Sequence, residues 1–338
     1  MNDHAARRLR RLIAGDALER TEAAAFVGEL MDGALDDVSA AGALVALAMR
    51  GESVEEIVGA AEAMRARMVE LVHDSGEVID IVGTGGDGAG TINLSTMAAL
   101  VLAAAGIPVA KHGNRAASSA CGSADVLEAC GYRLDLSADR SARILRDTGF
   151  TFLFAPRYHP AMRNVANVRR TLGVRTIFNL LGPLCNPARA PLALVGVARE
   201  ELVEPIGEVM RALGVRAGGV ICGEGGVDEA IGDGVTYLYR FDQRQVRRER
   251  IDSRTLGISV PLGDLVERTV EDAAGAFRDI LGGRRSGRSE VVALNAAVAM
   301  FVVGRAASLE SALERAREIL ASGHALALFE RAAEASRA

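Results

Sequence analysis

Apolar residues recur every three or four positions from Thr21 to about Leu71. That period places them along one face of a helix. Gly51 marks the expected end of one helix, and Ser53-Val54-Glu55-Glu56 has the pattern of a capping box that opens the next. The first part of the chain is therefore predicted to be helical, without strands.

The pattern changes at Val78 to Val82, a short run rich in β-branched residues that ends in glycines. A helical pattern follows over Thr96 to Ala105, and Ile107 to Val109 is typical of a second strand. Further strands are expected at 151–154, 192–197, 219–222 and 236–241, and further helices at 137–148, 201–213, 290–303 and 309–320. This alternation favours an α/β fold with a mainly parallel central sheet covered by helices.

Length, composition and charge limit the classes of protein to which this chain can belong. The 338 residues suffice for one large or two ordinary domains, and 49% hydrophobic with 25% charged residues is typical of a soluble globular protein. The net charge of -5 and the pI near 5.7 argue against a nucleic-acid binder, which needs clustered basic residues to neutralise phosphates. The one basic run, Arg244 to Arg250, alternates with Gln and Glu and is interpreted as a solvated strand or turn.

The cysteines and the start of the chain bear on its compartment. Cys121, Cys130, Cys185 and Cys222 are far apart and form no Cys-x-x-Cys pair, so neither a zinc site nor a disulfide framework is expected. Residues 1–12 are Arg-rich without the long apolar core of a secretory signal, and the apolar runs elsewhere are shorter than a membrane span. We expect a cytoplasmic protein with reduced thiols and no membrane partner.

A single lysine stands among the basic residues. Of these 39 residues, all are arginines except Lys111, which lies in Lys111-His112-Gly113-Asn114. An ammonium is a compact point charge, which suits one phosphate oxygen in a space too small for a planar guanidinium. Lys111 is therefore the first candidate for chemistry. The alternative is chance survival on a solvated surface, where lysines usually lie.

A glycine-rich segment, Gly83 to Thr91, follows the first predicted strand directly. Glycines let a backbone pass close to an anion. The subset Gly83-x-Gly85-x-x-Gly88 formally matches a dinucleotide fingerprint, but that fold needs an acidic residue after the next strand, and here that strand runs into Lys111. A Walker loop is excluded as well, because Lys111 is preceded by Ala110 and followed by His112.

The tetrapeptide Asn93-Leu94-Ser95-Thr96 lies where the next helix begins. Residues of these types commonly cap free N–H groups, and the same N–H groups can form an anion site. Helix capping alone would account for them. The glycine loop before them and the basic turn expected at Lys111 favour a phosphate pocket instead, at the carboxyl ends of the parallel strands.

Several motifs, in this order, resemble the anthranilate phosphoribosyltransferase family. The earlier ones are Gly83-Thr84-Gly85-Gly86-Asp87, Asn93-Leu94-Ser95-Thr96, Lys111-His112-Gly113-Asn114-Arg115, Ser118-Ser119 and Gly122-Ser123-Ala124-Asp125. The later ones are Tyr158-His159-Pro160-Ala161-Met162, Val168-Arg169-Arg170, the run from Arg175 to Leu184, Asp228-Glu229 and Leu294-Asn295-Ala296-Ala297. The resemblance spans nearly the whole chain, and the ordered set is far more specific than any one motif.

The resemblance implies that the amine of anthranilate displaces pyrophosphate from phosphoribosyl pyrophosphate, with Mg²⁺ bound, in tryptophan biosynthesis. Leaving-group departure builds positive charge on the sugar, as in other oxocarbenium-like displacements, so stabilising the pyrophosphate is the main catalytic task. The residues implied around the donor are Gly83, Gly86, Asp87, Thr91, Asn93, Leu94, Ser95, Thr96, Lys111, His112, Gly113, Asn114, Arg115, Ser118, Ser119 and Ser123.

A metal site is implied at Asp228 and Glu229 together with the Ser95 hydroxyl. Mg²⁺ characteristically uses one or two carboxylates plus substrate phosphates. A solvated turn is the alternative for an Asp-Glu pair next to glycines.

The acceptor site is implied at Gly83, Asn114, His159, Arg169 and Gly182, with His112 beside the ring. Arg169 would pair with the carboxylate of anthranilate, and it is expected, with Lys111, to be a catalytic residue. A structural role is the alternative for His159. No residue is an obvious general base, and an aromatic amine, neutral at pH 7, could react by positioning alone.

The family's architecture is nucleoside phosphorylase/phosphoribosyltransferase-like, with substrates in a cleft between two domains. It implies a small helical domain over residues 1–72, with a contribution from 165–181, and a larger α/β domain over 73–338. A homodimer through the helical domain is also implied, and the apolar faces near residues 41–48 are compatible with it. Ala120-Cys121 and Ile231 depart from the family's more polar pattern, which affects contacts around the site.

Two other functions stay open. A pyrimidine-nucleoside phosphorylase has the same architecture and binds anions in a similar way, but it catalyses phosphorolysis. Assays with a panel of substrates separate this activity from phosphoribosyl transfer. A catalytically silent relative that binds nucleic acid should lose the pair Asp228-Glu229 and gain a basic face, whereas this chain keeps the pair and has a net charge of -5.

Overall fold

The computed structural model describes residues 3–116 and 120–338, and its first part is helical as predicted. The helices are α1 (Asp3–Ile13), α2 (Arg20–Met31), α3 (Asp37–Arg50) and α4 (Val54–Arg65). Gly51 ends α3, and the Ser53 N–H donates to the Glu56 carboxylate at 2.8 Å in the expected capping box. Gly59 lets α4 cross α2 closely, because a Cβ there would lie 2.1 Å from the Arg20 carbonyl oxygen.

The rest of the chain alternates strands and helices around one sheet. The strands are β1 (Ile79–Gly83), β2 (Val109–Gly113), β3 (Phe150–Phe154), β4 (Leu192–Gly196), β5 (Ala217–Gly223), β6 (Val235–Phe241) and β7 (Val246–Asp252). The helices are α5 (Leu94–Ala104), α6 (Ser123–Ala129), α7 (Ala138–Thr148), α8 (Ala155–Tyr158), α9 (Arg163–Leu172), α10 (Phe178–Leu181), α11 (Val203–Ala212), α12 (Val270–Leu281), α13 (Gly287–Val302), α14 (Leu309–Ala321) and α15 (His324–Arg337).

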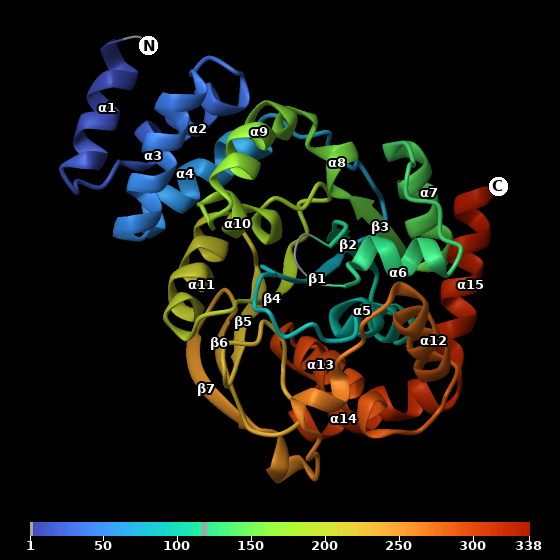
Figure 1. The fold of residues 1–338 in the computed structure, drawn as a ribbon. Coiled ribbons are helices and arrows are strands. Elements are labelled where there is room, and N and C mark those ends of the chain that lie inside the picture. The colour runs from blue at the N-terminus through green and yellow to red at the C-terminus, as the bar shows by residue number, and fades with distance from the viewer. Residues whose placement is uncertain (1–2, 117–119) are drawn as a thin grey trace.

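The seven strands lie in the order β3-β2-β1-β4-β5-β6-β7 (Figure 1). β1 to β5 are parallel, which confirms the predicted mainly parallel sheet, and β6 and β7 extend it as antiparallel strands. The chain order reverses between β1 and β4. Loops that leave the carboxyl ends of such strands border the crevice where α/β sheets bind ligands.

The two faces of the sheet belong to different cores. Ile79 and Ile81 point into a core that includes buried residues of α5 and α12 to α15. Val195 and Val220 point into the other core, which also contains buried residues of α1 to α4 and α9 to α11. Figure 1 shows α1 to α4 at one end of the molecule beside α9 and α10, with the C-terminal helices across the sheet.

The segment 165–181, which was expected to join the N-terminal helices, packs against them. Val165, Val168, Ile177 and Phe178 lie in the same core as residues of α2, α3 and α4. The Asn164 side chain also donates to the Met31 carbonyl at 2.6 Å. Within the described residues, no helix is both long and apolar enough to cross a bilayer.

One local expectation is wrong. Lys111, His112 and Gly113 were expected in a turn after a strand ending at Val109, yet they form the second half of β2. The strand continues because β2 stays paired with β3 along its length, with Lys111 opposite Phe152. The basic run 244–250 lies largely in β7, whose exposed positions agree with a solvated strand.

Candidate active site

Lys111 lies in the protein interior rather than on a solvated surface. It is 1% exposed, and its Nζ donates to the Ile81 carbonyl oxygen at 2.5 Å and to Ser95 Oγ at 3.4 Å. Burial lowers the Lys111 pKa to about 8, and the negative charges of Asp80, Glu229 and Asp228 act in the opposite direction. The single lysine of the chain therefore carries its charge from β2 to the first turn of α5.

Asp228 and Glu229 follow β5 and turn back to the glycine loop. Glu229 accepts from Thr91 Oγ1 at 2.8 Å and from the Ser95 N–H at 3.2 Å, and Asp228 accepts from the Gly85 N–H at 2.6 Å. Burial, followed by repulsion from a neighbouring carboxylate, raises the pKa of both groups. The pair is thus largely buried and not a solvated turn, and the raised pKa values mean that a positive charge is needed to keep both carboxylates ionised.

These two carboxylates are suited to a hard cation. Across residues 3–116 and 120–338, no Lys or Arg forms an ion pair with them, and no group of three or more His, Cys, Asp or Glu side chains could hold a metal alone. Mg²⁺ keeps several ligands from water and phosphate and needs one or two protein carboxylates. The donor set of Asp228, Glu229 and Ser95 Oγ fits this requirement.

Glycines at two strand ends make room for Asp228. A Cβ at Gly83 would lie 2.2 Å from Asp228 Oδ2, and one at Gly196 would lie 1.6 Å from its carbonyl oxygen. The next loop glycines, Gly85 and Gly86, have φ values of +67° and +71°, which favour glycine. Asp87 lies in the same loop and accepts from the Ala89 N–H at 3.1 Å. The loop is therefore closely packed against the carboxylate pair.

The start of α5 carries polar atoms that lack partners. Asn93 precedes the helix, but its side chain makes no capping bond, and its Nδ2 donates to the Cys121 carbonyl at 3.1 Å. Its Oδ1 is buried without a partner, as are the hydroxyls of Thr84 and Thr96. Leu94, the first helical residue, is buried. Capping does not account for Asn93, and such unsatisfied buried atoms are rare unless a ligand or water meets them.

The segment after β2 turns toward α6. Ser123 Oγ donates to the Asn114 carbonyl at 3.2 Å, and a Cβ at Gly113 would lie 2.5 Å from that hydroxyl. The Arg115 guanidinium pairs with Asp125 at 2.9 Å and with Glu128 at 2.7 Å. The role of Arg115 at the donor stays a prediction, and the predicted residues Ser118 and Ser119 lie outside the described residues.

Two histidine rings lie together beside β2, with 5.0 Å between their centroids. His112 Nδ1 donates to the Gly182 carbonyl at 3.0 Å, because a carbonyl oxygen accepts only, and Nε2 is left as an acceptor. Nε2 of His112 and both ring nitrogens of His159 are buried without partners. Burial lowers the pKa of His112 to about 3 and that of His159 to about 4, so both rings are neutral.

Arg169 lies on α9, the helix that follows His159 in the chain. Its guanidinium carbon is 5.5 Å from the centre of the Phe178 ring, and its Nε is buried without a partner. Burial lowers the Arg169 pKa. A partly desolvated guanidinium with a free donor suits a carboxylate ligand.

Four residues near this site were given no role from the sequence. Arg175 donates to the Gly85 and Gly86 carbonyls at 2.9 and 3.1 Å, and Asn295 of α13 exchanges two hydrogen bonds with the backbone of Ala230. Asp80 and Asn186 are buried between β1 and β2. For two of them the sequence held a signal of a buried polar role: Asp80 is an acid inside an apolar strand, and Asn295 is an amide inside an apolar helix.

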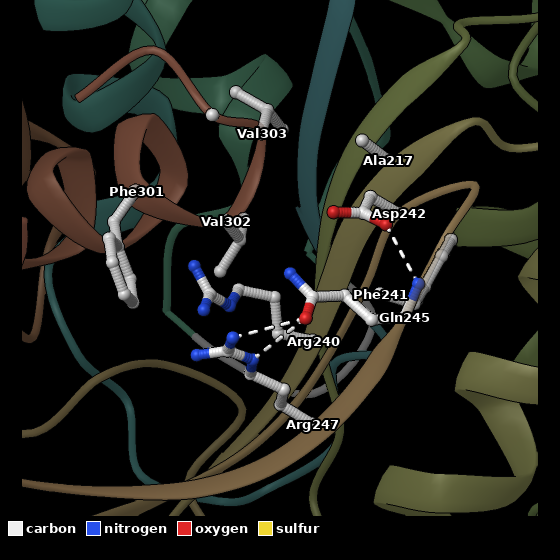
Figure 2. A pocket seen from close by; sticks show the side chains of 10 residues that line it. Ala217, Arg240, Phe241, Asp242, Gln245, Arg247, Phe301, Val302 and Val303 are labelled. Carbon is white, nitrogen blue, oxygen red and sulfur yellow. Dashed lines mark hydrogen bonds between the residues drawn. The ribbon is translucent and has the colours of Figure 1, made fainter. Parts of the chain in front are cut away.

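A cavity of about 100 Å³ lies away from the candidate site, beside the first residue of β5 and thus at the amino end of that strand (Figure 2). Figure 2 shows Arg240 and Arg247 pointing into it. Arg240 lies 4.1 Å from the centre of the Phe301 ring and pairs with Glu249 at 3.0 Å, and Arg247 donates to Gln245 at 3.0 Å. These contacts engage both guanidinium groups, and none of the predicted site residues lines this cavity.

Two family models match the chain. The helical bundle domain of a glycosyl transferase family matches residues 7–68, and the a/b domain of a glycosyl transferase family matches residues 75–326. Curated relatives match over nearly the full length. The anthranilate phosphoribosyltransferase of Methylobacterium radiotolerans is 45% identical, covering 97% of this chain and 95% of the relative, and that of Thermomicrobium roseum is 44% identical, covering 96% and 94%.

Solved structures agree in fold. The crystal structure of anthranilate phosphoribosyltransferase from Thermus thermophilus is similar with a TM-score of 0.93 at 43% identity, covering 98% of this chain and 99% of that one. The enzyme of that name from Saccharomyces cerevisiae, in complex with PRPP and Mg, has a TM-score of 0.92 at 23% identity, covering 100% and 99%. At that lower identity the likeness concerns the fold alone.

Proposed function

Because this chain belongs to the anthranilate phosphoribosyltransferase family, we propose that it transfers the phosphoribosyl group of phosphoribosyl pyrophosphate to the amine of anthranilate. The products are N-(5-phosphoribosyl)anthranilate and pyrophosphate, in tryptophan biosynthesis. The observation that supports this most directly is the buried Lys111 ammonium beside Ser95, where the loops after β1 and β5 meet.

We propose that the donor phosphates lie against the glycine loop and the first turn of α5. The buried hydroxyls of Thr84 and Thr96 have no partner and can donate to phosphate oxygens, while the unpartnered Asn93 Oδ1 can accept from a hydroxyl of the sugar. Lys111 adds a focused positive charge. As the pyrophosphate leaves, these fixed groups meet its growing negative charge without having to reorganise.

Asp228, Glu229 and the Ser95 hydroxyl would hold Mg²⁺, which neutralises charge on the pyrophosphate when it is bound. The chain's own part is to keep the two carboxylates adjacent although they repel each other. Thr91 and the Ser95 N–H orient Glu229, and the Gly85 N–H orients Asp228. These bonds leave the carboxylates ready for a cation.

The acceptor would lie near His112, His159 and Arg169. The Arg169 guanidinium would pair with the carboxylate of anthranilate, while the neutral histidine rings, together with Asn114 and the backbone at Gly83 and Gly182, would shape its ring site. Neutral imidazoles offer acceptor nitrogens to an aromatic amine. Positioning that amine against the anomeric carbon can then replace general base catalysis.

We further propose the domain division and assembly that the family suggests. Residues 1–72 with 165–181 would form the helical domain and 73–338 the α/β domain, since the segment 165–181 shares the helical core. Two copies would associate through the helical domain, where Ile13, Val38 and Met49 are 70%, 83% and 83% exposed. We also propose a cytoplasmic location.

The test of the function is loss of anthranilate fluorescence when the purified protein is mixed with phosphoribosyl pyrophosphate and Mg²⁺. We expect loss with Mg²⁺ and none after chelation. If folded protein causes no loss with Mg²⁺, the proposal is wrong, and phosphorolysis of pyrimidine nucleosides followed by filter binding of single-stranded DNA would be assayed next.

Lys111→Arg keeps the positive charge and tests the role proposed for Lys111 at the donor. A guanidinium is wider than an ammonium and cannot occupy the 2.5 Å contact with the Ile81 carbonyl in the same way. We expect kcat/KM for the donor to fall about 100-fold, as for a lost electrostatic contact in an active site. The exposed Arg285→Lys is the control, and donor kinetics like the wild type in Lys111→Arg would contradict the role of Lys111.

A further inference from the structure

Strands β1 and β2 are neighbours that part toward their carboxyl ends. Among the described residues, their register pairs a single position, Ile79 with Val109, whereas β1 with β4 and β2 with β3 each pair along five positions. Backbone groups in the opening are buried and need other partners. The opening adjoins the proposed donor site, because Lys111 and His112 come from this half of β2.

Side chains fill this opening. Lys111 Nζ donates to the Ile81 carbonyl at 2.5 Å, and Asp80 Oδ1 accepts from the His112 N–H at 3.1 Å. Asn186 Nδ2 bridges the two strands, since it donates to Asp80 Oδ2 at 2.7 Å and to the Ala110 carbonyl at 2.8 Å. Asp80 is 1% exposed and Asn186 is 5% exposed, so water competes little for these bonds.

Asn186 also connects the opening to a third segment. It lies between the short 3₁₀ turn 182–184 and β4, and its Oδ1 accepts from the Ala188 N–H at 2.8 Å. Each polar atom of the Asp80 and Asn186 side chains therefore has a partner. A fully satisfied buried network of this kind holds its backbone partners in one arrangement.

Asp80 is also the main counter-charge of Lys111. Burial lowers the Lys111 pKa, and Asp80 opposes this effect more than Glu229 or Asp228 does. Asp80 belongs to the same opening and directly precedes Ile81, whose carbonyl Lys111 contacts. Its carboxylate thus serves both the backbone of His112 and the charge of Lys111.

We propose that Asp80 and Asn186 are positioning residues, which hold the separated ends of β1 and β2 at the spacing that Lys111 and His112 require. Neither residue would touch a substrate. Lys111 would be set toward the donor phosphates and His112 toward the acceptor, so a single network would align both substrates. The inference rests on the proposed transferase function.

Two variants test the network. Asp80→Asn keeps the size of the side chain, but its NH₂ must face either the His112 N–H or Asn186 Nδ2, so one donor meets another. Asn186→Ala removes the bridge and leaves Asp80 bonded to the His112 N–H. Ser336→Ala is the matched control, because it also removes a buried acceptor of a backbone N–H, that of Arg133 at 2.8 Å, on the distant helix α15.

The first readout is independent of activity. Lys111 is the single lysine of the sequence, so protein grown with isotope-labelled lysine gives one side-chain NMR signal, from this residue. We expect that signal to move in Asp80→Asn and in Asn186→Ala and to stay in place in Ser336→Ala. An unmoved signal in Asn186→Ala would overturn the proposal.

The second readout is steady-state kinetics. Loss of a buried hydrogen bond to a charged group is expected to lower kcat/KM for the donor about tenfold or more. KM for anthranilate should rise as well, because His112 shares the network. Kinetic constants equal to those of the wild type in both variants would also overturn the inference.

These experiments distinguish a folding defect, or failure of the proposed function, from failure of the inference itself. If Asp80→Asn does not fold, as judged by circular dichroism, Asn186→Ala decides the question by the same two readouts. If the wild type has no transferase activity, the proposed function fails, and the Lys111 signal still shows whether Asp80 and Asn186 position the ammonium.

Discussion

Burial sets the protonation states of the histidines in the site. His112 and His159 are each 3% exposed, and their pKa values of about 3 and about 4 keep both rings neutral at physiological pH. A cationic ring would be costly here, because His112 lies between His159 and Lys111, which both disfavour a further positive charge. Neutral rings suit a site whose expected acceptor is an uncharged aromatic amine.

His159 should make the folded protein sensitive to acid. Its folded pKa of about 4 lies below the ordinary value of 6.5, so between these values the unfolded chain binds a proton that the folded chain does not. The stabilisation is present above pH 6.5 and is lost as the pH falls toward 4, by on the order of 3 kcal/mol.

Urea unfolding at about pH 7 and about pH 4 measures this contribution, since the slope of stability against pH counts bound protons. His159→Gln should lose less free energy of unfolding between the two pH values than the wild type does. His324→Gln, on the exposed side of α15, should lose as much as the wild type. Equal losses in all three proteins would show that His159 does not titrate in this way.

At the scale of elements, α13 packs against the segment that carries Asp228 and Glu229, the proposed metal ligands. Asn295 in this helix accepts from the Ala230 N–H at 3.0 Å and donates to the Ala230 carbonyl at 2.9 Å. Its Nδ2 also donates to the Val291 carbonyl of its own helix at 2.9 Å. Ala230 directly follows Glu229, so the helix fixes the backbone that carries both carboxylates.

Replacing Asn295 should therefore weaken cation binding at the proposed metal site. In Asn295→Ala, we expect the Mg²⁺ concentration for half-maximal activity to rise about fivefold, as for an outer-shell partner of a metal ligand, while KM for anthranilate is unchanged. Titration of Mn²⁺ by electron paramagnetic resonance gives a readout without turnover.

A matched variant separates this effect from general destabilisation of a helix. Thr269→Ala removes the exposed N-cap of α12, which accepts from the Asp272 N–H at 3.1 Å, and costs about 1 kcal/mol of stability. Its metal dependence should equal that of the wild type. The same metal requirement in Asn295→Ala as in Thr269→Ala would argue against a role for α13.

At the scale of the whole molecule, contacts between distant segments assemble the site. Arg65 at the end of α4 donates to the Leu184 carbonyl at 2.8 Å and to the Leu213 carbonyl at 3.0 Å. The N-terminal helices are thereby tied to segments that border β4 and β5. His159 lies beside His112 of β2, and Asp228 packs against Gly83 at the end of β1.

The N-terminal helices also carry the proposed dimer surface. Val38 and Met49 are eleven residues apart, about three helical turns, and so lie on one exposed face of α3. We expect light scattering to give twice the 35.4 kDa mass of one chain, and Val38→Glu with Met49→Glu to give the single mass.

Val72→Glu is the control for this pair of substitutions. Val72 is 81% exposed, much like Val38, but lies after α4 and outside the helices. This variant should keep the mass of the wild type. A wild-type mass of one chain would contradict the dimer, and a doubled mass in Val38→Glu with Met49→Glu would place its interface elsewhere.

Sequence patterns predicted the helical start, the βαβ unit and the parallel sheet, because periodicity and capping are local properties. They also selected Lys111 and Ser95, and the family resemblance added Glu229; the structure brings the three together at the strand ends. The bounds of β2 were missed, since charged residues inside a buried strand break the apolar pattern. Asp80 and Arg175 were passed over because their partners are far away in sequence.

By itself, the sequence determined the helical start and the mainly parallel sheet, and it selected the candidate residues of an anion site. Only the tertiary structure decided that Lys111 is buried, that β1 and β2 part, and that Asp80 and Asn186 fill the opening between them. The physical reason is that burial and hydrogen-bond partners depend on which strands become neighbours. That choice follows from long-range packing of both sheet faces and cannot be read from any local stretch of the chain.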